Sequence, residues 1–151
     1  MSKKEEGFTL IELMIVVLII AVLIAIAIPT FLGLRKNAND VAAKGSASTA
    51  LKAAKAIFSD SDSYTGVTLA ELRAAEVSVT YVDGATASNG SLIASVDVPD
   101  PSTFVASVYS PSGTCFFIRD DTSGTTYATL NTGTADCYGS NAAVVFGGSW
   151  P

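Results

Sequence analysis

The stretch that decides the fold is Gly7–Ile28, which reads GFTLIELMIVVLIIAVLIAIAI. After Glu12, residues 14–28 contain no charged or hydrogen-bonding side chain. From Phe8 to Ile28 there are 21 residues, about 31 Å of α-helix and enough to cross a bilayer. An ionisable group inside such a segment costs roughly 2.5–3.5 kcal/mol by insertion scales. We therefore expect Glu12 to have a partner or a functional purpose.

Residues 7–12, Gly-Phe-Thr-Leu-Ile-Glu, resemble the processing site of type IV prepilins and the related pseudopilins. The resemblance covers about residues 3–29. It implies that a dedicated prepilin peptidase removes a hydrophilic leader, residues 1–7, by cleaving between Gly7 and Phe8 on the cytoplasmic side. It also implies that Phe8 becomes the mature, N-methylated first residue. Glu12 would then pair with the terminal amine of Phe8 in a neighbouring subunit during assembly.

Electrostatics favours the same pairing. A chain beginning at Phe8 would carry a cationic amine at one end of an apolar helix, with Glu12 as the only anion nearby. The attraction between them is stronger where water is scarce, and each charge offsets the desolvation cost of the other. Pairing between adjacent, axially staggered helices would make Glu12 set the stagger of a helical bundle. The alternative is a Glu12 that is protonated or lies at the membrane interface.

A second, amphipathic half is expected to continue the helix to about residue 58. Pro29 has no amide to donate and Gly33 loosens the next turn, so we expect a kink at these residues. Apolar and small residues then recur at three- and four-residue steps, with cations largely between them. The alternative is two separate helices broken at Pro29. The residues of the expected buried face are Phe31, Leu34, Ala38, Val41, Gly45, Ala47, Leu51, Ala54 and Phe58.

The remainder of the chain predicts a β-rich head. Thr68 and Glu71 have the spacing of a capping box, which predicts a short helix to about Ala75. Turn residues separate six segments of alternating or β-branched sequence, and the short gaps favour an antiparallel meander packed on the second half of the long helix. These segments are Val77–Val82, Leu92–Val98, Phe104–Tyr109, Cys115–Arg119, Thr126–Leu130 and Ala142–Phe146.

The sequence therefore predicts an α+β fold with four parts. Residues 1–7 are the leader, and residues 8–29 form a hydrophobic helix that spans the membrane or lies in a filament core. Residues 30–58 form an amphipathic helix that continues into the head. Residues 59–151 form the globular head.

Cys115 and Cys137 are the only cysteines. Two cysteines in an exported head predict one disulfide, and two buried free thiols are the alternative. Basic residues lie on both sides of the apolar run, so they do not decide the orientation of the helix in the membrane. A disulfide would decide it, because it would place the head outside the cytoplasm. A disulfide-bounded C-terminal region also resembles that of many type IV pilins.

Charge is divided along the chain. Residues 35–55 contain five cations and one acid, whereas residues 60–151 contain two cations and ten acids. A basic stem could attract the acidic head of a neighbouring subunit, or the acids could simply keep the head soluble. No basic patch with interleaved aromatic residues is present, so we expect no direct nucleic-acid binding. The sequence has no histidine, which excludes Ser-His-Asp and Cys-His catalysis, and we expect no enzyme, cofactor or metal site.

Together these observations predict a structural subunit of a type IV pilus, which polymerises through its N-terminal helix into a homo-oligomeric helical filament. The family implies extracellular roles in motility, adhesion or DNA uptake. Its expected partners are prepilin peptidase, the inner-membrane pilus assembly machinery and, before assembly, the cytoplasmic membrane, with the N-terminus inside and the head outside. The alternative is a pseudopilin or minor pilin of a type II secretion or competence system, for which Asp120, Asp121 and Asp136 leave a calcium loop open.

Overall fold

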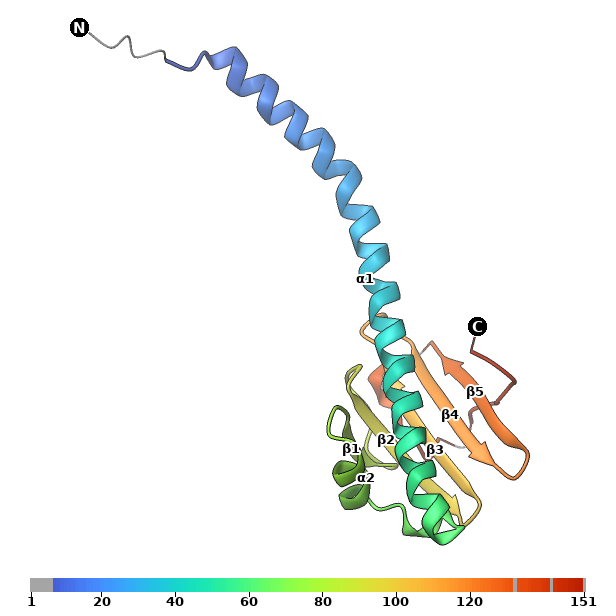
Figure 1. Cartoon of the computed structure of the whole chain (residues 1–151). Helices are drawn as coiled ribbons and strands as arrows, with labels where there is room; N and C mark the ends of the chain where they lie inside the picture. Colours follow the sequence, from blue (N-terminus) through green and yellow to red (C-terminus); the bar gives the residue numbers. More distant parts are fainter. Residues whose placement is uncertain (1–6, 132, 142, 151) are drawn as a thin grey trace, which may run out of the picture. The chain divides into compact units, whose positions relative to one another are not determined.

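The structure, a computed structural model, describes residues 7–131, 133–141 and 143–150. The helix α1 (Leu10–Ser61) comes first, followed by η1 (Tyr64–Gly66), α2 (Leu69–Ala75), five strands and η2 (Thr134–Asp136) (Figure 1). One long helix with a mostly antiparallel sheet confirms the expected α+β fold class. Apart from Gly7, the expected leader lies outside the described residues.

The chain divides into two compact units, residues 1–35 and 36–151, and α1 contributes to both. α1 is a single helix of 52 residues that contains Pro29, which favours a continuous helix over two separate ones. Proline has no N–H for the helical ladder. In the following residue, the Thr30 hydroxyl donates to the Ile26 carbonyl at 3.2 Å. Whether Pro29 and Gly33 form a kink stays a prediction.

The sheet in the second unit has the order β1-β2-β3-β4-β5. β2 to β5 form the predicted antiparallel meander. β1 instead pairs in parallel with β2, with Thr80 opposite Ile93 and Asp83 opposite Val96, so a wholly antiparallel sheet was wrong. Parallel neighbours require the chain to run back along the sheet between the two strands. Residues 84–92 are long enough to do so beside a strand of four residues. The bounds are β1 (Thr80–Asp83), β2 (Ile93–Asp100), β3 (Thr103–Tyr109), β4 (Cys115–Asp121) and β5 (Gly124–Leu130).

The sixth predicted strand, Ala142–Phe146, is not formed in its described part. Ala142 lies outside the described residues, and residues 143–146 belong to no strand. The backbones of Tyr127 and Gly147 instead form one isolated bridge, with N···O distances of 2.8 and 2.7 Å. Trp150, which donates its indole N–H to the Phe117 carbonyl at 3.0 Å, also ties this segment to the sheet.

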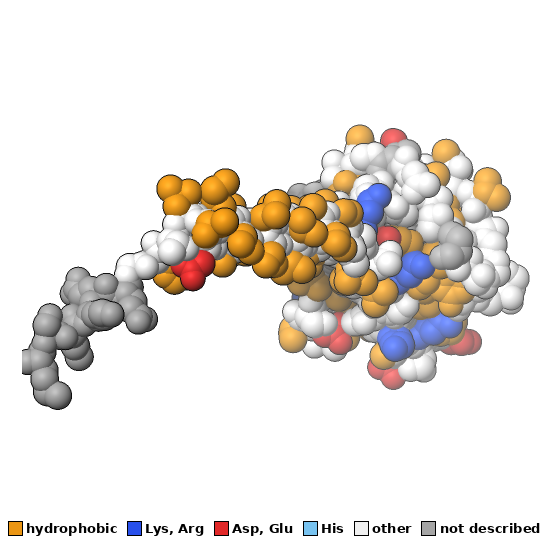
Figure 2. All heavy atoms as spheres, turned by 90° about the horizontal axis from the view of Figure 1, so that it is seen from above, with side chains coloured by type: hydrophobic (Ala, Val, Ile, Leu, Met, Phe, Trp, Pro, Cys, Tyr) orange, Lys and Arg blue, Asp and Glu red, His pale blue; other side chains and the backbone are white. Residues whose placement is uncertain are grey.

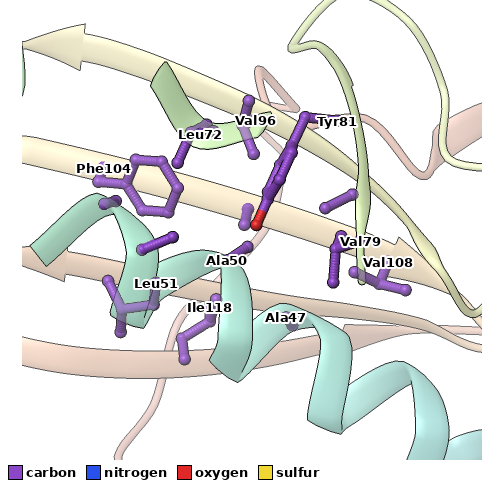
Figure 3. Packing of buried hydrophobic residues seen from close by; sticks show 14 of the residues in the cluster. Ala47, Ala50, Leu51, Leu72, Val79, Tyr81, Val96, Phe104, Val108 and Ile118 are labelled. Atoms are coloured by element: carbon purple, nitrogen blue, oxygen red, sulfur yellow. The ribbon is translucent and has the colours of Figure 1, made fainter. Parts of the chain in front are cut away.

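One face of the sheet packs on the second half of α1 (Figure 3). Alanines dominate the helical side of this core, and small side chains let the helix backbone come close to the strands. Part of the predicted face was wrong, because Phe31, Leu34, Ala38, Val41 and Gly45 are all exposed, Val41 to 70%. The buried α1 residues are Ala43, Ser46, Ala47, Ala50, Leu51, Ala53 and Ala54.

The opposite face of the sheet is covered by the C-terminal segment. Cys115 and Phe117 of β4 pack there with Ala128 of β5 and Cys137. Gly139 passes so close to β2 that a Cβ atom would lie 3.0 Å from the Ser95 carbonyl oxygen. The head is therefore a sheet covered on both faces, by α1 on one side and by the chain after β5 on the other.

Candidate assembly site

The N-terminus of α1 is closed by a capping box between Thr9 and Glu12. Thr9 N–H donates to Glu12 Oε2 at 2.9 Å, and Glu12 N–H donates to Thr9 Oγ1 at 3.3 Å. The Thr9 hydroxyl also donates to Glu12 Oε2 at 2.5 Å. The first turn of a helix has N–H groups without partners, and a capping box satisfies two of them reciprocally.

Sequence reasoning missed this box, although its signal was available. Thr9 and Glu12 have the same spacing as Thr68 and Glu71, which were recognised and do form a capping box at the start of α2. Glu12 therefore has a partner within its own chain. Both bonds that Thr9 donates to the Glu12 carboxylate reach Oε2, and Oε1 of Glu12 makes no hydrogen bond to any residue that the structure describes. One carboxylate oxygen is thus open to a second partner.

The surface of α1 in the first unit is apolar and exposed. Every large hydrophobic side chain from Phe8 to Leu34 is at least 46% exposed, with Phe8 itself at 81%. A hollow of about 390 Å³ on this surface is lined by Leu10, Leu13, Met14, Val17, Leu18 and Ala21. Figure 2 shows the hydrophobic side chains gathered along this part of the helix. By length and composition, α1 is a helix that could cross a membrane. So much contiguous apolar surface requires lipid or protein to cover it.

The other predicted site residues belong to both units of the chain. Gly7 and Phe8 immediately precede the capped start of α1. Cys115 and Cys137 form the predicted disulfide, with a Cα–Cα distance of 5.5 Å, so the alternative of two free thiols is wrong. The pairing of Glu12 with the amine of a second chain involves two subunits and stays a prediction.

The adjacent acids Asp120 and Asp121 have different surroundings. Asp120 faces α1, where its carboxylate lies 2.8 Å from Lys55 Nζ and accepts hydrogen bonds from the hydroxyls of Tyr64 and Thr125, each at 2.6 Å. Asp121 pairs instead with Arg119 of its own strand. Adjacent strand residues point to opposite faces, so these two acids do not converge on one site.

These contacts shift the protonation equilibria in the head. Burial raises the pKa of Asp120, but hydrogen bonds from Lys55, Thr125 and Tyr64 and the Lys55 charge together hold it below its ordinary value. Burial, followed by the hydrogen bond to Asp120, raises the pKa of Tyr64. The network therefore keeps Asp120 ionised and Tyr64 neutral, and joins α1, η1, β4 and β5.

Comparison with known proteins bears on the same N-terminal segment. A family model described as "Prokaryotic N-terminal methylation motif" matches residues 2–28. The chain is 44% identical over 63 residues to the Type IV wide pilus major component PilA4 of Thermus thermophilus. The matched stretch covers 42% of this chain and 48% of that protein. It is also 44% identical over 63 residues to the Type IV major pilin protein PilA of Myxococcus xanthus, covering 29% of that protein. The chain is therefore similar to type IV pilins over part of its length.

The likeness to these pilins is local. It spans less than half the length of each of the pilins compared. A third pilin, the Type IV narrow pilus major component PilA5 of Thermus thermophilus, is 56% identical over 36 residues and is covered over 31% of its length. No solved structure matches the chain. The matched methylation motif, residues 2–28, contains the capping box and the apolar part of α1.

Proposed function

We propose that this chain is a structural subunit of a type IV pilus, and that it polymerises through the first part of α1 into an extracellular filament. The observation that carries the proposal is a capped helix whose apolar side chains are exposed and whose first turn holds one acid, Glu12. The matched relatives are named as major components of type IV pili, which supports the same role. The role proposed is structural and involves no catalysis.

In this proposal, peptidase cleavage after Gly7 prepares the subunit for assembly. Cleavage creates an amine on Phe8, which is then methylated, one residue before the cap at Thr9. Glu12 keeps its Oε2 bonds to Thr9 and offers Oε1 to the amine of a neighbouring subunit. Because apolar helices surround the pair, its attraction is stronger than in water and an unpaired charge is strongly disfavoured. Subunits with the wrong stagger are thereby excluded.

Before assembly, we place the subunit in the cytoplasmic membrane. Lipid would cover the exposed apolar surface of α1 until other subunits replace it, with the N-terminus inside and the head outside. The Cys115–Cys137 disulfide supports this orientation, since disulfides persist in oxidising compartments. The proposed partners at this stage are prepilin peptidase and the inner-membrane assembly machinery. Assembly would then move the helix from lipid into a helical core made of identical helices.

The proposal is tested by shearing filaments from native cells and measuring the intact mass of this chain. We expect an abundant species that begins at methylated Phe8 and is two hydrogens lighter because of the disulfide. The same processed mass in membranes alone would replace the proposal with a pseudopilin or minor pilin. A chain that keeps residues 1–7 in cells containing the peptidase would contradict it at its first step.

Two substitutions separate the charge of Glu12 from its capping role. Glutamine also serves in a capping box, so Glu12→Gln keeps the bonds to Thr9 and removes the negative charge. Glu12→Ala removes both. We expect both variants to be made and inserted into the membrane, and both to yield at least tenfold fewer filaments, as counted by electron microscopy of sheared fractions. Normal filaments from Glu12→Gln would mean that Glu12 acts only as a cap.

A further inference from the structure

The head has a groove between α1 and α2 that the fold itself does not fill. Two hollows of about 490 and 390 Å³ lie between these helices. Both are lined by Ala75, so they adjoin and form one groove, hereafter the α1–α2 groove. Its apolar lining comes from Ala53, Ala56 and Ile57 of α1 and from Ala74 and Ala75 of α2. Short side chains on both walls leave room for the side chains of another protein segment.

The charged residues of the groove give it a net negative charge. Asp60, Glu71 and Glu76 line it, with Lys52 as the single cation, which gives a formal charge of −2. Glu71 and Glu76 are bound only to neutral groups, the N–H and hydroxyl of Thr68 and the N–H of Ser78. These bonds hold Glu71 and Glu76 in position without neutralising their charges. An occupant with an apolar surface and one or two cations would match this groove.

The same chain carries such a segment at residues 31–36, Phe-Leu-Gly-Leu-Arg-Lys. Its apolar side chains are exposed, with Phe31 at 64% and Leu34 at 63%. Arg35 and Lys36 are also exposed and have no acidic partner among the residues that the structure describes. By contrast, Lys55 and Arg119 are paired with acids of the head. The segment thus presents two unneutralised cations beside apolar side chains.

We propose that, in the assembled filament, the α1–α2 groove of one subunit receives residues 31–36 of a second copy of this chain, with Arg35 and Lys36 facing Asp60, Glu71 and Glu76. This inference rests on the proposed function, because it requires filaments. The charge distribution of the sequence suggested a general attraction between the basic stem of one subunit and the acidic head of another. The proposed contact assigns that attraction to specific residues. Close charge complementarity of this kind fixes which surfaces meet and in which register.

The contact is tested first by site-specific cross-linking. A photoreactive benzoylphenylalanine replaces Ala75 in the groove or, as a control, the exposed Ala135 in η2. Sheared filaments are irradiated, and cross-linked dimers are digested and mapped by mass spectrometry. We expect the Ala75 probe to join residues 31–36 of a second copy and the Ala135 probe not to do so. Filaments in which the Ala75 probe reaches another segment, another protein or nothing would overturn the inference.

Charge reversal provides a second test. Arg35→Glu with Lys36→Glu is expected to lower filament yield at least tenfold, with the subunit still processed and membrane-inserted. Adding Asp60→Lys and Glu76→Lys is expected to restore at least half of the yield. These two changes place cations near helix C-termini, where they are favourable, so the head should remain folded. The matched control adds Asp83→Lys and Asp136→Lys, at exposed acids outside the groove.

The outcomes separate this inference from the proposed function. Equal restoration by the control pair would show that total charge matters rather than the groove, and no restoration by either pair would also refute the contact. If the unaltered chain forms no filaments at all, the proposed function itself fails. If filaments form but the Ala75 probe does not reach residues 31–36, only the groove contact fails.

Discussion

At the scale of single residues, Asp120 is a charge that connects several elements of the head. It joins Lys55 of α1, Tyr64 of η1 and Thr125 of β5 to β4. Because these bonds hold the pKa of Asp120 below its ordinary value, its contribution to stability is complete above the unfolded-state pKa of about 3.9. That contribution is lost as the pH falls through the lower pKa of the folded state.

Asp120→Asn is therefore expected to destabilise the head by about 1–3 kcal/mol at pH 7, because Lys55 loses its charged partner. It should also weaken the fall in stability below pH about 4. Thermal unfolding of the detergent-solubilised chain, followed by circular dichroism from pH 7 to pH 3, measures both effects. The control is Asp136→Asn, at an exposed acid. An Asp120→Asn variant with the same acid dependence as the unaltered chain would contradict the assignment.

Tyr81 provides the opposite case, a buried polar group without a partner. Its ring is fully buried between the sheet and α1, and its hydroxyl makes no hydrogen bond to the described residues (Figure 3). Burial, with the charge of Glu76, raises its pKa to about 12. Since the unfolded-state pKa is about 10, the folded state loses stability as the pH rises from about 10 to 12.

Tyr81→Phe is expected to leave stability at pH 7 unchanged or to raise it by about 1 kcal/mol, because an unsatisfied buried hydroxyl is costly. It should also reduce the loss of stability between pH 9 and pH 11. Tyr64→Phe is the matched comparison, since that hydroxyl donates to Asp120 at 2.6 Å, and we expect it to destabilise the head. Urea unfolding of the three proteins measures the difference, and a clear loss in Tyr81→Phe would show that its hydroxyl has a partner.

At the scale of elements, the sequence predicted best where one periodic signal acts alone. β2 to β5 were located because their apolar residues alternate and turn residues separate them. The direction of β1 was not predictable in this way, because it depends on how residues 84–92 return along the sheet. The same limit applies to the buried face of α1. Helical spacing alone did not reveal that alanines, rather than Val41 and Gly45, pack against the strands.

For the candidate site, the sequence predicted the chemical groups but not all of their contacts. A functional role for Glu12 was expected because an acid stands inside a long hydrophobic segment. The exposed apolar surface was expected from that same segment. The capping bonds to Thr9 were not predicted, although Thr9 and Glu12 have the spacing of a capping box. The α1–α2 groove requires residues from two helices and could not be inferred from either one.

The element-scale prediction concerns Pro29, which lies inside α1 and has no N–H to donate to the helical ladder. Pro29→Ala restores an N–H and removes a ring clash, a change of about 3 kcal/mol in favour of the helix. We expect slower amide exchange of residues 30–36 in detergent, measured by mass spectrometry. Gly33→Ala, where a Cβ meets no atom within 4 Å, should slow it by less. Unchanged exchange in Pro29→Ala would show that the helix is not loosened at that position.

At the scale of the whole molecule, the disulfide holds the C-terminal segment over the second face of the sheet. Cys115 lies in β4, while Cys137 is 22 residues later and accepts a hydrogen bond from Ser88 N–H at 2.7 Å through its carbonyl. Two residues on, Gly139 N–H donates to Ser95 Oγ of β2 at 2.9 Å. The disulfide thus connects β4 to a segment that runs across this face of the sheet as far as β2.

Replacing Cys115 and Cys137 with alanine should therefore affect more than the joined residues. The chain-entropy model gives a loss of about 3 kcal/mol for a loop of this length. Because a small sheet has little stability to spare, we expect a clear drop in the melting temperature of the head. Amide exchange should accelerate most at residues 137–140. Both cysteines are fully buried, so a mild reductant without denaturant should leave the unaltered chain unchanged. If the double variant melts normally, the hydrogen bonds of Cys137 and Gly139 hold the segment without the covalent bond.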